Sequence, residues 1–147
     1  MKKILPPTLF YIGLIISILL HYTLPLKQII EYPFNLIAFL FFVIGTGLNI
    51  WADQLLKKQK TTVKPNEKPT TLIETGAFKI SRNPMYLGMA VILLGAGFIL
   101  GSIISFIGVI LFIAVIEFVF IPLEEKNLYE QFGEKFEAYE KKVRKWI

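Results

Sequence analysis

The residues best suited to holding a charged ligand begin with the run Arg82-Asn83-Pro84-Met85-Tyr86. Asn before Pro is typical of a helix start, because Asn caps the helix and Pro fits its first turn. The free N–H groups of such a turn favour a carboxylate or phosphate, and the Arg82 guanidinium would add a forked donor beside them. A plain helix cap is the simpler interpretation of these residues taken alone.

A second polar feature is the pair Glu124-Glu125, which follows Pro122 at the end of a long apolar stretch. Adjacent carboxylates at a helix C-terminus repel each other and oppose the helix dipole. A solvated pair at the membrane surface is one interpretation, and binding of a ligand ammonium is the other. Combined with the run at Arg82, the pair fits a zwitterion such as the amino acid end of S-adenosylmethionine, without selecting it over other zwitterions.

Glu117 is the one charged residue well inside an apolar stretch. Ionisable residues within a membrane are candidates for function, so a small transporter that couples flux to Glu117 is an alternative. Glu117 lies about one turn from the end of its span, and its carboxylate could instead reach the interface. A structural membrane protein whose basic loop binds anionic lipid is a third possibility.

The composition excludes several kinds of site. The 147 residues contain no Cys and one His, which rules out disulfides and thiolate nucleophiles and predicts no metal site. Hydrophobic residues make up 54% and charged residues 18%, whereas soluble domains have about 45–50% and about 25%. The apolar excess is clustered, which predicts one membrane domain over residues 1–147. The net charge of +5 therefore reflects topology rather than nucleic-acid binding.

Four apolar runs approach the ~20 residues that a membrane span needs. They predict an all-α fold, an integral membrane bundle of four transmembrane helices over residues 8–26, 34–51, 85–100 and 102–121. The last two would form a tight hairpin, in which glycines let the two backbones approach closely. These glycines are Gly88, Gly95, Gly97, Gly101 and Gly108. In the second run, Gly45-Thr46-Gly47 indicates either close helix packing or a flat wall against a ligand.

The basic residues predict the orientation. Two of them (Lys2 and Lys3) precede the first run, seven lie in residues 52–83 and six follow the fourth run, so 15 of the 16 lie on one side. The positive-inside rule then places both termini in the cytoplasm, and we expect a bacterial inner membrane. On that side lie a cytoplasmic loop, residues 52–83, and an amphipathic tail helix, residues 123–147, whose apolar positions recur at helical spacing.

The order of these motifs resembles that of a known family. Residues 72–88 resemble the signature of the isoprenylcysteine carboxyl methyltransferases, a family similar to the phospholipid methyltransferases. The second half of the signature is Glu124-Glu125, Phe132-Gly133 and the tail Val143-Arg-Lys-Trp-Ile147. The run Asn83-Pro-Met-Tyr86 is similar to the phospholipid methyltransferases and to a bacterial branch of the family. The resemblance covers about residues 45–147.

The resemblance implies a membrane methyltransferase that uses S-adenosylmethionine. The loop, the start of the third helix and the C-terminal segment would enclose the cofactor at the cytoplasmic face. Carried over to this chain, the catalytic residues are Arg82, Tyr86 and Glu124. The cofactor-binding residues are Thr70, Thr71, Leu72, Ile73, Phe78, Asn83, Pro84, Met85, Tyr86 and Glu125.

The implied methyl acceptor is a lipophilic substrate that comes from the bilayer. A carboxylate of the isoprenylcysteine type, or a similar small lipophilic substrate, needs no base, and Arg82 could orient it. A phospholipid amine is the alternative, and it must lose a proton, which a nearby Glu could accept. We expect membrane lipids as further partners and no nucleic acid, and the sequence leaves the oligomeric state open.

Overall fold

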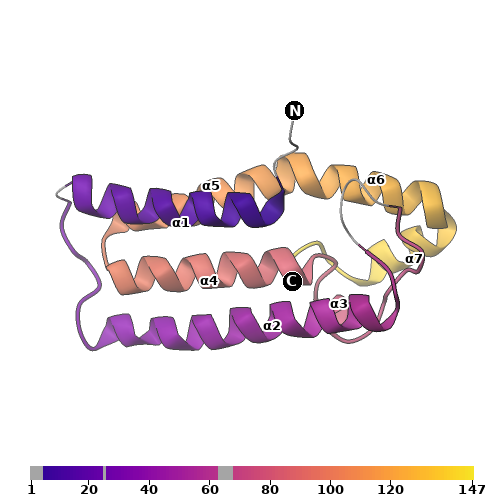
Figure 1. Ribbon diagram of the computed structural model, residues 1–147, viewed down its shortest axis with the longest axis horizontal. Coiled ribbons are helices and arrows are strands. Elements are labelled where there is room, and N and C mark those ends of the chain that lie inside the picture. The colour runs from indigo at the N-terminus through magenta and orange to yellow at the C-terminus, as the bar shows by residue number, and fades with distance from the viewer. Residues whose placement is uncertain (1–4, 25, 63–67) are drawn as a thin grey trace.

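The computed structural model describes residues 5–24, 26–62 and 68–147 (Figure 1). Every regular element within these residues is helical and none is a strand, which confirms the predicted all-α class. The longer helices are α1 (Pro6–Thr23), α2 (Ala38–Lys58), α4 (Pro84–Leu100), α5 (Ile107–Val115), α6 (Ile121–Phe132) and α7 (Glu134–Lys142). Short helical turns are η1 (Phe34–Ile37), α3 (Ala77–Ile80), η2 (Ile103–Phe106) and the π turn η3 (Ile116–Phe120).

Three helical stretches are long and apolar enough to cross a membrane, as in an integral membrane protein: Pro6–Thr23, Phe34–Lys58 and Ile103–Phe132. A fourth apolar helix, α4, has 17 residues and is therefore about 26 Å long. It begins with Pro84 in its first turn and ends at Gly101, whose φ of 76° suits glycine. The structure thus confirms the predicted helix over residues 85–100 and the break that follows it.

The predicted ends of the first two helices are wrong. The first helix runs over Pro6–Thr23 rather than residues 8–26. The second continues to Lys58, so the predicted loop over residues 52–83 begins too early. Its last two turns are polar in sequence, but Ala52 and Leu56 on one face are buried against α3. This packing extends the helix beyond its apolar run.

The predicted boundary between the fourth span and the tail is also wrong. The chain is helical from Ile103 through Phe132, without a break at Pro122. A proline inside a helix normally clashes with the preceding turn, but here the wider π turn η3 comes directly before it. The tail is not one helix over residues 123–147. Gly133, with φ of 50°, separates α6 from α7, and residues 143–147 are not helical.

The glycines bring different helices together than the sequence predicts. Helix α4 lies along α2, and α5 lies along α1 (Figure 1). A Cβ atom at Gly45 of α2 would lie 2.6 Å from the carbonyl oxygen of Gly88 in α4. Gly108 of α5 similarly faces Gly13 of α1. The predicted close glycine packing within the hairpin is found at Gly97, where a Cβ would lie 2.8 Å from the Phe106 ring, whereas Gly88 and Gly108 face α2 and α1 instead.

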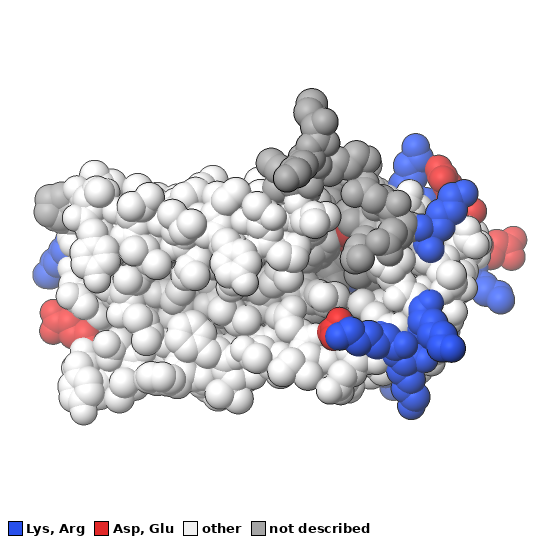
Figure 2. Space-filling model, in the orientation of Figure 1, with Lys and Arg blue, Asp and Glu red and all other residues white. Residues whose placement is uncertain are grey.

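The charged residues are concentrated at one end of the molecule. Figure 2 shows Lys and Arg gathered where α2 ends and where α6 and α7 lie, with a broad uncharged band over the remaining helices. Large apolar side chains are exposed on these helices, among them Val43 of α2 at 72% and Phe118 of η3 at 79%. An apolar surface of this extent suits contact with lipid. Lys2, Lys3 and Lys64, which contributed to the predicted orientation, lie outside the described residues.

Candidate functional site

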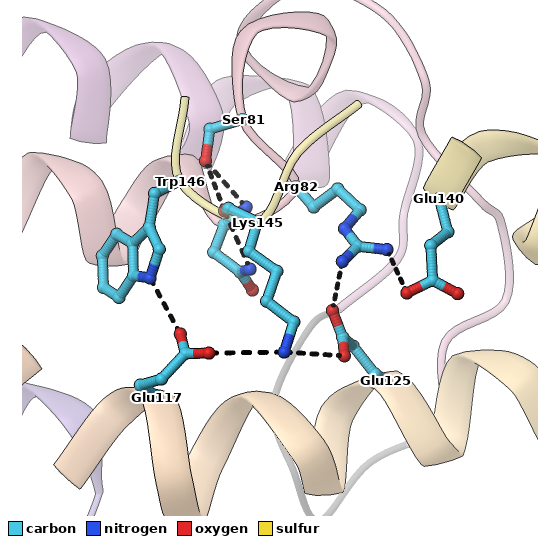
Figure 3. Close-up of polar contacts among 8 residues, drawn as sticks. Ser81, Arg82, Glu117, Glu125, Glu140, Lys145 and Trp146 are labelled. Carbon is cyan, nitrogen blue, oxygen red and sulfur yellow. Dashed lines mark hydrogen bonds and ion pairs between the residues drawn. The ribbon is translucent and has the colours of Figure 1, made fainter. Parts of the chain in front are cut away.

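Arg82 occupies the centre of a polar cluster at the charged end of the molecule (Figure 3). Its side chain, only 7% exposed, precedes α4 and meets carboxylates from two other helices. Nη2 lies 2.9 Å from Oε1 of Glu125 on α6, and Nη1 lies 2.7 Å from Oε1 of Glu140 on α7. The guanidinium also lies over the ring of Phe136, 5.9 Å from its centre. The structure therefore brings together Arg82 and Glu125, which the sequence assigned to one ligand.

The donors of Arg82 are not fully used. Among the residues that the structure describes, Nε of Arg82 is buried without a hydrogen-bond partner. The ion pairs of Nη1 and of Glu125 Oε1 lack hydrogen-bond geometry. Buried polar groups are normally hydrogen-bonded, and a guanidinium has five N–H donors. Arg82 thus has donor capacity left for an anionic group, and the Glu125 carboxylate beside it has an acceptor oxygen without a hydrogen bond.

Residues 143–147, the C-terminal segment, pack against the start of α4. The carbonyl of Lys145 accepts hydrogen bonds from Ser81 Oγ at 2.9 Å and from Asn83 Nδ2 at 3.1 Å. The backbone N–H of Arg82 donates to the carbonyl of Arg144 at 3.0 Å. Asn83 occupies the N-cap position of α4, as predicted, but its side chain makes no capping hydrogen bond. Its amide instead fastens the C-terminal segment.

On its other side, the same segment contacts the continuous helical stretch Ile103–Phe132, the long helix. Nζ of Lys145 lies 3.3 Å from Glu117 Oε1 and 3.8 Å from Glu125 Oε2. The indole Nε1 of Trp146 donates a hydrogen bond to Glu117 Oε2 at 2.8 Å. Five charged residues from four parts of the chain therefore form one connected network: Arg82, Glu117, Glu125, Glu140 and Lys145.

Tyr86 and Glu124 form a separate buried pair. The phenol of Tyr86 on α4 donates a hydrogen bond to Glu124 on α6, and the two residues are 6% and 5% exposed. Successive residues of a helix point about 100° apart, so Glu124 and Glu125 meet different partners. The structure thus does not use them as one dicarboxylate site.

The other predicted cofactor residues fall into two groups. An apolar cluster beside α3 holds Ile73 and Phe78, with Met85 packed against it. Leu72 packs against Phe136, Tyr139 and Val143, and Pro84 is fully buried. Thr70 and Thr71 are exposed, and their backbone N–H groups donate to Thr61 Oγ1 at 3.0 and 3.2 Å. Their hydrogen bonds tie the loop to the end of α2, and their cofactor role stays a prediction.

Tyr139 holds α7 against α3. Its phenol donates a hydrogen bond to the carbonyl of Phe78 at 2.5 Å, and the residue is buried. Burial raises the pKa of the Tyr139 phenol above its usual range. The phenol therefore remains a donor at neutral pH, and α7 stays joined to the element that leads into Arg82.

Four residues were not predicted as site residues: Glu140 and Lys145 of the network, and Ser81 and Trp146 beside it. The sequence analysis singled out Glu117 without a partner. Lys145 and Trp146 were assigned to one continuous tail helix, which hid their return to α4. The basic-tryptophan ending of the chain was the available signal. Within the described part of the chain, no group of three His, Cys, Asp or Glu residues could hold a metal ion.

Comparisons with known proteins show the family to which the chain belongs. Residues 34–135 match the phospholipid methyltransferase family, which confirms the resemblance seen in the sequence. An uncharacterized protein of Haemophilus influenzae is 41% identical over 63 residues, which are 43% of this chain and 100% of that protein. The family match covers more than half of the chain and includes Arg82, Tyr86 and the Glu124-Glu125 pair. The chain therefore belongs to the phospholipid methyltransferase family.

Proposed function

We propose that the protein is an S-adenosylmethionine-dependent membrane methyltransferase that acts on a lipophilic acceptor. The family assignment supports a membrane methyltransferase in general. The observation that supports the cofactor assignment is the largely buried pair between Arg82, before α4, and Glu125 on α6, with unused donor capacity on Arg82. A zwitterionic amino acid end requires such a pair, a cation for its carboxylate and a carboxylate for its ammonium.

The proposed binding site extends from this pair along the start of α4. Arg82 and the free N–H groups of the first turn would hold the carboxylate, and Glu125 would hold the ammonium. The remainder of the cofactor would lie against residues 83–86, Phe78 and residues 70–73. When bound, S-adenosylmethionine supplies an activated methyl group. The protein then mainly has to align the acceptor, and positioning of this kind lowers a barrier by about 7–11 kcal/mol.

The proposed acceptor is a phospholipid amine rather than an isoprenylcysteine-type carboxylate. An amine must lose a proton, and the buried Glu124 carboxylate, oriented by the Tyr86 phenol, is suited to accept it. An Arg82 that holds the cofactor carboxylate is no longer free to orient an acceptor carboxylate. The isoprenylcysteine-type substrate remains the second candidate because of the signature in residues 72–88.

The proposed topology has four spans with both termini in the cytoplasm of a bacterial inner membrane. Helix α4 is within the length range of a span and lies alongside α2 (Figure 1). Basic residues at one end of the molecule (Figure 2) support a cytoplasmic site. Lipophilic acceptors would then reach it directly from the bilayer.

The transporter alternative has less support. It requires Glu117 to bind and release a transported proton or ion. The Glu117 carboxylate is instead ion-paired with Lys145 and hydrogen-bonded to Trp146. The family assignment also favours methyl transfer over transport.

The function is tested with purified protein in nanodiscs and S-adenosylmethionine labelled in its methyl group. Vesicles of phosphatidylethanolamine offer the amine, vesicles of phosphatidylglycerol lack it, and a farnesylcysteine analogue offers the carboxylate. We expect label in the phosphatidylethanolamine sample alone. Label in the farnesylcysteine analogue alone would overturn the amine assignment. No label in any sample, from protein that is folded and binds no S-adenosylhomocysteine, would overturn the proposed function.

A further inference from the structure

We infer that Glu117 is a positioning residue of the proposed cofactor site and acts through Lys145 and Trp146. The inference rests on the proposed function, since it concerns the same site. Both carboxylate oxygens of Glu117 are engaged by the C-terminal segment: Oε2 accepts from Trp146 Nε1 at 2.8 Å, and Oε1 lies 3.3 Å from Lys145 Nζ. Glu117 is thereby the anchor of this segment on the long helix.

The segment that Glu117 anchors also touches the residues proposed to hold the cofactor. The carbonyl of Lys145 accepts hydrogen bonds from Ser81 and Asn83 on either side of Arg82. Figure 3 shows the Lys145 side chain lying between Glu117 and Glu125. Its ammonium is 3.3 Å from Glu117 and 3.8 Å from Glu125. Glu117 therefore holds the ammonium of Lys145 closer to itself than to Glu125.

The π turn η3 (Ile116–Phe120) makes this arrangement possible. Glu117 and Glu125 are eight residues apart. In a regular α-helix this separation corresponds to a rotation of about 800° about the helix axis, so the two side chains would point roughly 80° apart. The π turn takes up an additional residue, so the two carboxylates come to the same side of the helix. Both consequently reach the single ammonium of Lys145.

The charges explain why the anchor matters for a cationic ligand. The network contains three carboxylates, of Glu117, Glu125 and Glu140, and two cations, Arg82 and Lys145. The network therefore has one more carboxylate than it has cations, which favours an ammonium beside Glu125. Without the Glu117 charge, Lys145 would pair with Glu125 alone and would compete with the ligand ammonium there. Glu117 thus keeps Glu125 accessible to the ligand and keeps the C-terminal segment in place.

The structural part of the inference is tested by tryptophan fluorescence. The chain has two Trp residues, so Trp51→Phe leaves Trp146 as the only tryptophan, which is excited at a wavelength that tyrosine does not absorb. Glu117→Gln keeps an acceptor for the indole and should leave the emission unchanged, whereas Glu117→Ala should shift the emission to longer wavelength and increase quenching by iodide. Equal spectra for all three proteins would overturn the anchoring role without any ligand being present.

The functional part is tested by calorimetric titration with S-adenosylhomocysteine. Glu117→Gln should weaken binding roughly tenfold, about the effect of one charged interaction, and should raise KM for S-adenosylmethionine with kcat little changed. Adding Lys145→Met should restore most of the affinity, because the competing ammonium is gone. Glu130→Gln, an exposed carboxylate on the same long helix, is the matched control and should bind like the wild type.

The possible results separate the inference from the proposed function. Wild-type affinity in Glu117→Gln, or a double variant that binds no better than the single one, would overturn the positioning role while the cofactor site stands. Absence of binding by the folded wild-type protein would overturn the proposed function and this inference with it.

Discussion

Arg82 before α4 and Glu125 on α6 form an ion pair, with 2.9 Å between Nη2 and Oε1 and side-chain exposures of 7% and 19%. The pair joins two helices that are distant in sequence, and it lies where the C-terminal segment crosses the start of α4 (Figure 3). Removing one partner of a buried ion pair destabilises a protein far more than removing one partner of an exposed ion pair. The pair therefore contributes to the fold as well as to the proposed site.

Replacing Arg82 should separate these two contributions. Arg82→Ala removes the cation that Glu125 and Glu140 share, leaving Lys145 beside Glu125, and should lower the free energy of unfolding by about 3 kcal/mol, the lower end for a broken buried pair. Arg82→Lys keeps the charge but loses the planar fork, so it should be less destabilised and still lose most S-adenosylhomocysteine affinity. Thermal unfolding in detergent and calorimetry measure the two effects. Lys142→Ala, at an exposed position on α7, is the control, and an Arg82→Lys protein that binds like the wild type would contradict the role.

The Tyr86–Glu124 pair should matter for chemistry more than for cofactor binding. Glu124→Gln should lower kcat with an amine acceptor by about 10²–10⁴, the usual contribution of general base catalysis, and change the Kd for S-adenosylhomocysteine less than about twofold. Tyr86→Phe leaves the Glu124 carboxyl without its donor, which should cost about 1–3 kcal/mol of stability. Steady-state rates and thermal unfolding measure these effects. Normal kcat in a folded Glu124→Gln protein would rule out Glu124 as the base.

Gly45 and Gly47 provide a matched pair for testing helix packing. A Cβ at Gly45 would lie 2.6 Å from the Gly88 carbonyl oxygen, whereas nothing lies within 4 Å of a Cβ at Gly47. Gly45→Ala should therefore destabilise the protein by about 1–3 kcal/mol, and Gly47→Ala should be neutral or stabilising by up to about 1 kcal/mol. Unfolding in a mild detergent compares them. Loss of S-adenosylhomocysteine binding in Gly47→Ala alone would instead support Gly47 as part of a ligand-binding wall.

Tyr139 predicts a dependence of stability on alkaline pH. Because burial raises the pKa of its phenol, the folded state binds this proton more tightly than the unfolded state. Its stabilising contribution is complete below the unfolded pKa of about 10 and is lost as pH rises through the folded pKa. Tyr139→Phe should be about 1 kcal/mol less stable at pH 8 and should lose less stability than the wild type between about pH 9 and about pH 11, on either side of the usual phenol pKa of about 10. Tyr22→Phe, at a position 78% exposed, should keep the wild-type profile, and identical slopes for all three proteins would contradict the assignment.

The sequence predicts much of the fold because apolar length and punctuation are local properties. Pro84 and Gly101 mark the ends of α4 within one residue of the predicted bounds. The failures have tertiary causes. Helix α2 continues to Lys58 because Ala52 and Leu56 find partners on α3, and Pro122 does not break the long helix because a π turn precedes it. Neither cause is visible in a hydrophobic pattern.

The sequence singles out the central pair of the candidate site, Arg82 and Glu125, but not the residues that surround this pair. Arg82 and Glu125 carry charges that a ligand would need, so residue type alone singles them out. Glu140, Lys145 and Trp146 join them only because Gly133 turns the chain and residues 143–147 return to α4. Glu117 reaches the same network through the π turn. A one-residue change in helical phase is enough to place a side chain on another face.

Cofactor binding tests the account most directly. S-adenosylhomocysteine is titrated into the folded wild-type protein, into Glu125→Gln and into the control Glu130→Gln. The account predicts saturable one-site binding by the wild type and the control, and at least tenfold weaker binding by Glu125→Gln, which keeps the shape of the side chain but not its charge (tenfold being about 1.4 kcal/mol). Equal affinities in Glu125→Gln and the wild type, or no binding by the folded wild type at millimolar ligand (about −4 kcal/mol), would contradict it.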